Sequence, residues 1–379
     1  MKDQEFLSSF QPFLQEKWEE AGFEAPTGIQ KKAIPAILEG GDVIAKSPTG
    51  TGKTLAYLLP LIEKIDPSKP HIQAVVLASS QELVMQIFEE AQKWTKGSDV
   101  KVGSFIGGAN VKRQVEKLKK NRPHIAFGTP GRVNELIKMK KFKMHEVKTI
   151  VIDEGDQLLI PEHISTVQDI IKSSLSERQV LLFSATLAGN SEQLADDLMS
   201  GEPHIFKIER DELTATKVDH IYFVCEGREK LDVLRKFLHA EKVKALGFVR
   251  DIGNLVVAAE KLEYKGISLG VLHSEAKKEE RATALKMLRK GDIPLLLATD
   301  VAARGLDVEG LTHVIHVDFP QDVTQYTHRS GRTGRGGKEG TVVSIVTQRE
   351  ERTLKQFAKE MNVSLTKKVL SRGKVEDAN

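Results

Sequence analysis

Residues 47–54, SPTGTGKT, bring two glycines, a lysine and a threonine together at a spacing that suits phosphate binding. The apolar run DVIA precedes them and the helix-like stretch LAYLLPLIEK follows, so we expect a strand to enter this loop and a helix to leave it. Glycines let backbone N–H groups surround phosphate oxygens at the positive end of a helix. The lysine would reach the β- and γ-phosphates, and the threonine hydroxyl would bind Mg²⁺. The candidate nucleotide-binding residues are Ser47, Pro48, Thr49, Gly50, Thr51, Gly52, Lys53 and Thr54.

A pair of carboxylates follows the apolar run TIVI, in the sequence DEGD at 153–156. Adjacent carboxylates at a strand end serve no packing purpose and cost free energy if they are buried without partners. Asp153 fits an acid that holds Mg²⁺ through water, and Glu154 fits a group that orients or deprotonates an attacking water. The alternative for DEGD is a solvated turn. The alternative for residues 47–54 is a glycine-rich turn in an unrelated fold, because Ser47 replaces the usual first glycine of the phosphate-loop pattern. The co-occurrence of the two patterns favours chemistry on a nucleotide.

The second half of the chain contains HRSGRTGR at 328–335, in which Arg329, Arg332 and Arg335 recur every three residues. One helical turn could project such arginines to the same side, and arginines opposite a γ-phosphate stabilise the charge of the transition state. The alternative is an ordinary basic surface helix. The intervening Gly331 and Gly334 argue against it, because each glycine costs about 1 kcal/mol inside a helix.

Short apolar runs must position these residues. They occupy 42–47, 74–79, 124–129, 149–154 and 179–186 in the first half, and 244–249, 267–273, 293–300, 313–320 and 341–346 in the second. Runs that are apolar throughout predict strands buried on both faces, and helix-like stretches such as 81–96, 109–121, 230–240 and 275–290 lie between them. This order predicts an α/β protein with parallel sheets. The polar residues directly follow the runs, where open α/β sheets bind ligands.

Length and composition are those of an intracellular globular protein with two domains or one large one. The chain has 379 residues, a formal net charge of +3 and one cysteine, Cys225. That count excludes an intramolecular disulfide framework and a zinc site built on cysteines. The weak net charge means that any nucleic-acid partner would be held by local patches. We expect a soluble, cytoplasmic protein, because no apolar run approaches a membrane span and Asp3 and Glu5 are atypical of a signal peptide.

Seven motifs, taken in order, resemble the DEAD-box RNA helicases of superfamily 2. They are GFEAPTGIQ (22–30), SPTGTGKT, TPGR (129–132), DEGD, SAT (184–186), ATDVAARGLDV (298–308) and YTHRSGRTGRGG (326–337), and the resemblance covers about residues 5 to 350. It implies two tandem RecA-like domains, each a mainly parallel sheet flanked by helices. Residues 1–206 would form the ATP-binding domain and 220–370 the second domain, with a polar linker at 207–219 and a short tail at 371–379.

The resemblance also implies roles for single residues. Gln30 would read the adenine edge, with Phe23 in the same motif, and either Phe6 or Phe10 would stack on the base. Arg332 and Arg335 would be arginine fingers, and Glu154, Lys53 and Asp153 complete the catalytic set. Gly305 and Asp307 would hold the nucleotide from the second domain, while Ser184, Ala185, Thr186 and Asp156 would couple hydrolysis to strand separation. RNA contacts would come from Gly107, Gly108, Thr129, Pro130, Gly131, Arg132, Arg250 and Thr299.

Four positions depart from the family pattern. Gln81 replaces an RNA-contacting arginine, which should slightly lower affinity for RNA and its salt dependence. Gly155 replaces the alanine of DEAD, Lys278 replaces a glutamine upstream of the retained Arg281, and VRD at 249–251 replaces a commoner ending. None of the four removes a group that the ATPase chemistry requires.

The sequence therefore predicts a monomeric, RNA-stimulated ATPase that uses ATP and Mg²⁺. It would bind the sugar-phosphate backbone of RNA and separate or remodel RNA duplexes or ribonucleoproteins. Compact length resembles bacterial members, for which ribosome assembly is a common role. Two alternatives stay open: an ATP-gated RNA clamp with little unwinding, and a DNA-directed translocase. The basic runs KLKKNR (117–122) and KMKKFK (138–143) are interpreted as solvated helix ends, with an RNA-binding patch as the alternative.

Overall fold

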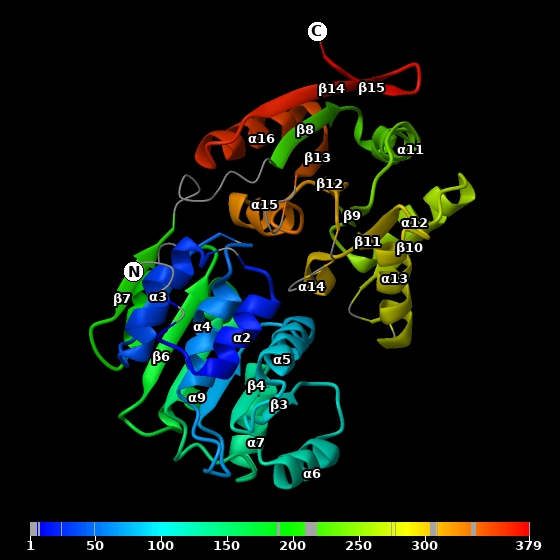
Figure 1. Ribbon diagram of the computed structural model, residues 1–379. Helices are drawn as coiled ribbons and strands as arrows, with labels where there is room; N and C mark the ends of the chain where they lie inside the picture. Colours follow the sequence, from blue (N-terminus) through cyan, green and yellow to red (C-terminus); the bar gives the residue numbers. More distant parts are fainter. Residues whose placement is uncertain are drawn as a thin grey trace. The chain divides into compact units, whose positions relative to one another are not determined.

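The computed structural model describes residues 6, 8–23, 25–48, 50–187, 190–208, 218–273, 275–276, 278–303, 308, 310–334 and 339–378. The chain divides into two compact units, Met1–Leu213 and Thr214–Asn379 (Figure 1). Lys207 ends the last strand of unit 1 and Val218 begins the first strand of unit 2. The predicted linker at 207–219 therefore falls mainly on residues outside the described ones.

Unit 1 alternates strands and helices, as the apolar runs predict. Its elements are α2 (Pro12–Glu20), α3 (Gly28–Leu38), β1 (Val43–Lys46), α4 (Lys53–Glu63), β2 (Ala74–Leu77), α5 (Gln81–Thr95), β3 (Val102–Phe105), α6 (Val111–Asn121), β4 (Ile125–Gly128), α7 (Pro130–Lys138), β5 (Thr149–Asp153), α8 (Gly155–Leu158), α9 (Pro161–Lys172), β6 (Gln179–Ser184), α10 (Asn190–Leu198) and β7 (His204–Lys207).

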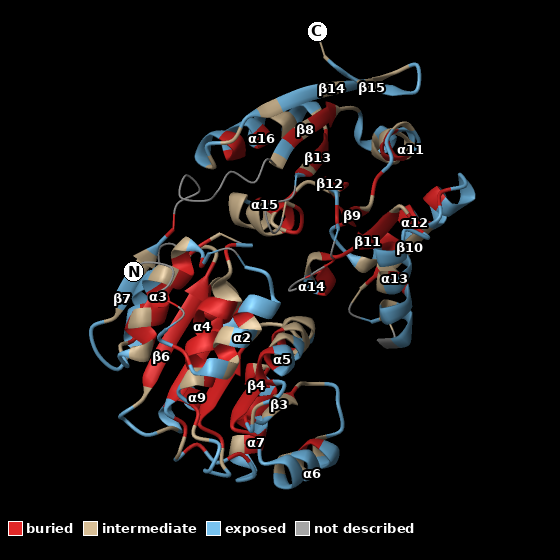
Figure 2. Ribbon diagram, in the orientation of Figure 1, coloured by how far each residue is buried: buried red, intermediate tan, exposed pale blue. Residues whose placement is uncertain are grey.

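Within the described residues, the strands of unit 1 form one parallel sheet in the order β3-β4-β2-β5-β6-β1-β7. Helices α2 to α5 pack on one face of it, and α6, α7, α9 and α10 pack on the other. The central strands β2, β4, β5 and β6 are buried along their whole length (Figure 2). This burial on both faces is why their sequences are apolar without alternation.

Unit 2 has the same layered organisation. Its elements are β8 (Val218–Val224), the 3₁₀ helix η2 (Gly227–Glu229), α11 (Lys230–Ala240), β9 (Ala245–Phe248), α12 (Ile252–Tyr264), β10 (Leu269–Leu272), α13 (Lys278–Lys290), β11 (Leu295–Ala298), α14 (Asp300–Ala303), β12 (His313–His316), α15 (Val323–Ser330), β13 (Gly340–Val346), α16 (Gln348–Glu360), β14 (Leu365–Ser371) and β15 (Lys374–Asp377).

The described strands of unit 2 follow the order β10-β11-β9-β12-β13-β8-β14-β15, and only the terminal pair β14–β15 is antiparallel. Helices α13 to α16 cover one face, and α11 and α12 cover the other. The segment expected to be a short tail, 371–379, contains strand β15. Leu370 and Val375 pack against the core between the sheet and helices α11 and α12. Two mainly parallel sheets flanked by helices confirm the predicted fold class. No helix in the described ranges is both long and apolar enough to cross a membrane.

Candidate active site and RNA-binding loops

Three of the predicted motifs meet at one edge of the sheet in unit 1. Strands β5, β6 and β1 are neighbours, and DEGD, SAT and SPTGTGKT respectively follow their carboxyl ends. A backbone hydrogen bond from Ser47 N to Ser184 O, 3.0 Å long, joins the phosphate loop directly to SAT. Strand order therefore brings together residues that are more than 100 positions apart in the chain.

The phosphate loop is held by its own polar groups. Lys53 Nζ donates to the carbonyl oxygens of Ser47 (2.5 Å) and Pro48 (2.9 Å). Ser47 Oγ donates to Thr51 Oγ1 (2.7 Å), which in turn donates to Pro48 O (2.8 Å). Gly52 caps α4 with φ of 86°, the left-handed conformation that glycine adopts readily. A phosphate bound in this loop would replace the two carbonyl oxygens as the hydrogen-bond partner of the Lys53 ammonium group. Thr49 lies outside the described residues.

Gln30 lies against the same loop. Its Oε1 accepts from Thr27 N (2.9 Å) and its Nε2 donates to Gly52 O (3.2 Å). A glutamine amide has two donors and two acceptor lone pairs, so one of each remains for an adenine edge. A Cβ at Gly52 would come within 2.6 Å of Gln30 Nε2, so this glycine is also required for the close approach of α3.

The aromatic residues near the start of the chain form a packed cluster. Phe6 is 0% and Phe10 is 5% exposed, and their rings meet edge to face at 5.4 Å. Phe23 is 45% exposed and lies 4.9 Å from the Trp18 ring. Neither Phe6 nor Phe10 presents a free ring face in this structure, and the partly exposed Phe23 has its ring parallel to that of Trp94, with centroids 6.4 Å apart. Base stacking by one of the first two stays a prediction that requires the cluster to open.

Asp153 is buried at the end of β5, with 5% of its surface exposed. Its Oδ1 accepts from Glu154 N and its Oδ2 accepts from Tyr57 Oη, both at 2.8 Å. Burial first, and then the Glu154 charge, raise the pKa of Asp153 to about 6, although the Lys53 charge acts in the opposite direction. Burial and Asp153 also raise the pKa of the Tyr57 phenol. Asp153 is thus kept in place by hydrogen bonds while its charge is poorly solvated.

We expect Asp153→Asn to stabilise the nucleotide-free protein. The folded-state pKa lies above the ordinary value of 3.8, so the folded chain binds this proton more tightly than the unfolded chain. The destabilisation by ionised Asp153 therefore develops as pH rises from about 4 to about 6 and is fully present above that range. The substitution should raise the free energy of unfolding by about 1–3 kcal/mol near pH 8 and by much less near pH 4. Urea unfolding at the two pH values measures the difference.

Asp66→Asn is the matched control for that measurement. Asp66 is partly exposed and accepts hydrogen bonds from Ser68, which lower the pKa of its carboxyl. Its ionised form is favoured by folding, so neutralisation should bring no gain in stability at high pH. Equal gains for the two variants would contradict a special cost of ionising Asp153.

Glu154 adopts a left-handed backbone conformation, with φ of 51°. A non-glycine residue pays strain in this region, and here the conformation turns the chain sharply from β5 into α8. The Glu154 carboxylate accepts a hydrogen bond from Ser79 Oγ, which follows β2. Its side chain is half-buried at the sheet edge, and its role as the group that orients water stays a prediction.

Ser184 of the SAT motif is hydrogen-bonded to the last aspartate of DEGD. Ser184 is fully buried; its Oγ donates to Asp156 Oδ1 and contacts Thr186 O at 2.5 Å. The same oxygen accepts from Asp156 N at 3.2 Å. Because Ser184 also bonds to the phosphate loop through its carbonyl, this one residue contacts the loop, Asp156 and Thr186. Ala185 lies between Ser184 and Thr186 in the chain and is partly exposed.

The predicted RNA-binding loops of unit 1 are braced against each other. Arg132 is buried, and its guanidinium donates to Ala109 O and to Glu135 Oε2, both at 2.9 Å. The loop of Gly107 and Gly108 therefore rests on the turn that contains TPGR. Thr129 caps α7, Pro130 is its first residue, and Gly131 is exposed. The structure uses the Arg132 guanidinium inside the protein, and a contact with RNA stays a prediction.

Gln81 is at the position where the family pattern has an arginine. A Cβ on Gly107 or Gly108 would lie 3.6 or 3.5 Å from Gln81 Nε2, so the amide faces this glycine turn. The substitution thus falls beside the backbone that is predicted to contact RNA.

In unit 2 the arginine-rich motif is anchored by one of its own residues. Arg329 is 3% exposed and donates to both carboxylate oxygens of Asp300, at 2.7 and 2.6 Å, and to Asp318 O at 2.7 Å. Its guanidinium also lies 4.9 Å from the centre of the Phe248 ring. Arg332 is 8% exposed and donates from Nε to His328 O at 3.2 Å. Arg329 therefore holds α15 on the sheet.

The remaining predicted residues of unit 2 are separate cases. Thr299 is buried at the end of β11, and Thr299 N donates to Leu272 O at 3.2 Å. Arg250 has an exposed side chain, while its backbone N donates to Asp318 Oδ2 at 2.8 Å. Gly305, Asp307 and Arg335 lie outside the described residues, so their roles stay predictions.

Two residues that touch the carboxylates were not found by sequence reasoning. Tyr57 lies in the apolar helix after the phosphate loop and bonds to Asp153; a lone phenol one turn beyond Lys53 was the available signal. Ser79 ends the apolar run at 74–79, and nothing in the local sequence indicates that it bonds to Glu154. No group of three or more potential metal-ligating side chains occurs in the part of the chain that the structure describes.

Tandem α/β units, with a phosphate-type loop and a carboxylate pair at one sheet edge, define a RecA-like architecture. Two family models match the chain: "DEAD/DEAH box helicase" over residues 27–194 and "Helicase conserved C-terminal domain" over residues 229–337. The chain is 56% identical over 371 residues to the "Probable ATP-dependent RNA helicase YfmL" of Bacillus subtilis, covering 98% of each chain. It is 53% identical to the "DEAD-box ATP-dependent RNA helicase CshC" of Bacillus cereus, covering 97% of this chain and 94% of the relative. The chain belongs to the DEAD-box helicase family.

Solved structures agree with this assignment. The chain resembles Saccharomyces cerevisiae Dbp5 bound to RNA and ADP BeF3, with a TM-score of 0.88 and 27% identity over 97% of this chain and 95% of that one. It also resembles Mss116p bound to ssRNA and AMP-PNP, with a TM-score of 0.83 and 26% identity over 96% of this chain and 78% of that one. These similarities confirm the predicted family and the RecA-like fold.

Proposed function

We propose that this protein is an RNA-stimulated ATPase that uses ATP to separate or remodel RNA duplexes locally. The observation that carries the proposal is the bonded series at one sheet edge: Lys53 in the phosphate loop, Ser184 next to it, and the carboxylates of Asp153 and Glu154 beside them. The printed names of YfmL and CshC support ATP-dependent RNA helicase activity, as do the RNA and nucleotide analogues bound to the similar structures.

Each residue has a defined part in this proposal. Lys53 leaves the two loop carbonyls and binds the β- and γ-phosphates, while Gln30 uses its remaining amide donor and acceptor for adenine. A Mg²⁺ ion fits this donor set, because a hydroxyl at Thr54 and a buried, oriented carboxylate at Asp153 are the oxygen groups it prefers. When bound it would neutralise phosphate charge. Glu154, oriented by Ser79, accepts the proton of the attacking water.

RNA and ATP are expected to favour the same closed arrangement of the two units. Arg332 and Arg335 then complete the nucleotide site, and RNA bound across both units is bent in a way that a duplex tolerates poorly. By linkage, RNA must tighten ATP binding by the same factor by which ATP tightens RNA binding. Ser184 and Asp156 are the hydrogen-bonded residues that would connect the phosphate loop to the segment after Ser184.

An ATP-gated RNA clamp is the second candidate, and Gln81 is the observation that favours it. A neutral amide beside the glycine turn replaces a charge that would hold RNA, so the grip in unit 1 is expected to be weaker. We also propose action in the cytoplasm as a monomer, with ribosome assembly as the process, on family resemblance alone.

Unwinding of a short duplex decides between the two candidates. We expect wild-type protein to separate a short RNA duplex with ATP and Mg²⁺, and to do so poorly on the matching DNA duplex. Binding without separation, equally strong with ATP and with a non-hydrolysable analogue, would identify the clamp. Preferential stimulation of the ATPase by DNA would refute the RNA assignment altogether.

A further inference from the structure

Positive charge is concentrated in one segment of unit 1 that the ATP site does not use. Residues 96–122 contain eight cations and two acidic residues, a net charge of +6, whereas the whole chain carries +3, so the rest of the chain is at −3. The cations are Lys96, Lys101, Lys112, Arg113, Lys117, Lys119, Lys120 and Arg122, and the acidic residues are Asp99 and Glu116. These eight cations are called the α6 surface below.

All eight side chains are exposed. Among the described residues, none of these cationic side chains forms an ion pair or a hydrogen bond within the protein. Helix α6 buries its opposite side, where Val111, Val115 and Leu118 pack on the core. The cations are thus available to a partner without any loss of internal contacts.

Local helix stability accounts for only some of these cations. Lys119 and Lys120 lie in the last turn of α6, where the helix dipole favours positive charge. Lys112 and Arg113 lie in the first turn, which contains no acidic residue and where the dipole disfavours positive charge. Cations placed against the dipole indicate a requirement other than the stability of the helix.

Helix α6, which carries most of the α6 surface, begins three residues after the glycine turn predicted to contact RNA. Asn110 follows Gly108 by two residues and caps the helix, its Oδ1 accepting from Arg113 N at 3.2 Å. Gln114 Nε2 donates to Ile106 O at 2.9 Å, which fixes the first turn of α6 to the strand end before the glycines. At about 1.5 Å per residue, the helix extends about 16 Å from that loop.

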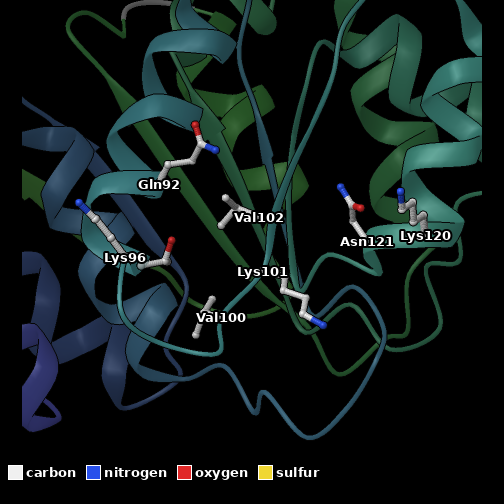
Figure 3. A pocket seen from close by; sticks show the side chains of 8 residues that line it. Gln92, Lys96, Val100, Lys101, Val102, Lys120 and Asn121 are labelled. Atoms are coloured by element: carbon white, nitrogen blue, oxygen red, sulfur yellow. The ribbon is translucent and has the colours of Figure 1, made fainter.

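The far end of the α6 surface borders a shallow depression of about 480 Å³ between the ends of α5 and α6 and the start of the edge strand β3. Lys96, Lys101 and Lys120 line it together with Gln92 and Asn121. Figure 3 shows that the side chains of Lys96 and Lys101 point in different directions, away from each other. Diverging ammonium groups cannot surround one small anion, but they suit phosphates spaced along a chain.

We propose that the α6 surface binds the phosphate backbone of RNA that continues from the glycine turn along α6. This inference rests on the proposed function, because it extends the RNA site of an RNA-dependent ATPase. Phosphate contacts of this kind add affinity without reading sequence. They would also offset the weaker grip expected from Gln81.

The test uses a triple variant, Lys112→Gln, Arg113→Gln and Lys117→Gln, in the full-length protein. The probes are a single-stranded RNA just long enough to stimulate the ATPase, and the same RNA extended by an unstructured segment at its 5′ or its 3′ end. We expect one extension to tighten binding to the wild type and the variant to lose this gain, on the order of tenfold, with a salt slope lower by about 2. Thermal unfolding of the variant should occur at the same or a higher temperature, because two of the cations oppose the dipole.

The control is Lys236→Gln, Lys242→Gln and Lys261→Gln, which removes three exposed charges from unit 2 away from the carboxyl ends of its strands. It should retain the gain from the extension. The inference is overturned if neither extension strengthens wild-type binding, or if the triple variant weakens short and extended RNA equally. Absence of ATPase stimulation by any RNA would instead refute the proposed function, so the two failures can be told apart.

Discussion

Glu154→Gln should bind ATP and RNA together and hydrolyse ATP at a rate lower by a factor of about 10²–10⁴. Glutamine keeps the size of the side chain, and its carbonyl can still accept the hydrogen bond from Ser79 Oγ that glutamate accepts. It cannot accept a proton from water. The loss should therefore appear in kcat at saturating ATP and RNA, with affinity for a fluorescent ATP analogue close to that of the wild type.

Glu162→Gln is the matched control, because Glu162 is an exposed carboxylate nearby in the chain at the start of α9. It should hydrolyse ATP normally. Near-normal RNA-stimulated hydrolysis by Glu154→Gln would remove Glu154 from its proposed role. Loss of nucleotide binding in that variant would instead point to a structural effect at the turn, where Glu154 has its left-handed conformation.

Arg335→Ala should reduce RNA-stimulated hydrolysis on the order of a thousandfold. The proposed guanidinium stabilises charge that develops on the transferred phosphoryl group, so kcat should fall far more than affinity for ATP. Single-turnover hydrolysis with saturating RNA isolates the chemical step from product release.

Two further variants serve as comparisons for Arg335→Ala. Arg332→Ala should show a loss of similar kind, whereas Arg372→Ala, in the turn between β14 and β15, should leave hydrolysis unaffected. Arg329 is unsuitable as a comparison, because its pair with Asp300 holds α15 in place and its removal would leave the half-buried Asp300 carboxylate without a cationic partner. An effect below about threefold for Arg335→Ala would place the finger elsewhere.

Most of the fold could be predicted from the pattern of apolar runs. All ten predicted runs contain strands, and α5, α6, α11 and α13 begin and end within about three residues of their expected positions. The strands that the pattern missed in unit 1 are β3 and β7, which are the edges of the sheet. An edge strand has fewer neighbours to bury it, so its sequence is less apolar and resembles a loop.

The site was predictable to the extent that its chemistry is local in sequence. The loop from Ser47 to Thr54, the pair Asp153–Glu154 and Ser184 all directly follow buried strands, so their gathering at one edge could be expected. The arginines were harder to interpret from spacing alone. Arg329 and Arg332 are both buried in unit 2, and of these two it is Arg329 that pairs with Asp300. Spacing could not predict this pair, because it depends on how α14 and α15 pack.

The sequence alone determined which residues could act on a nucleotide, which runs were strands, and which family the motifs resemble, because these properties depend on residue type, order and short-range periodicity. Tertiary structure decided which side chains meet: Tyr57 with Asp153, Ser79 with Glu154, and Arg132 with the carbonyl of Ala109. These contacts depend on the strand order β2-β5-β6-β1 and on how the helices cover the sheet. Periodicity along a single chain does not encode which distant strands become neighbours.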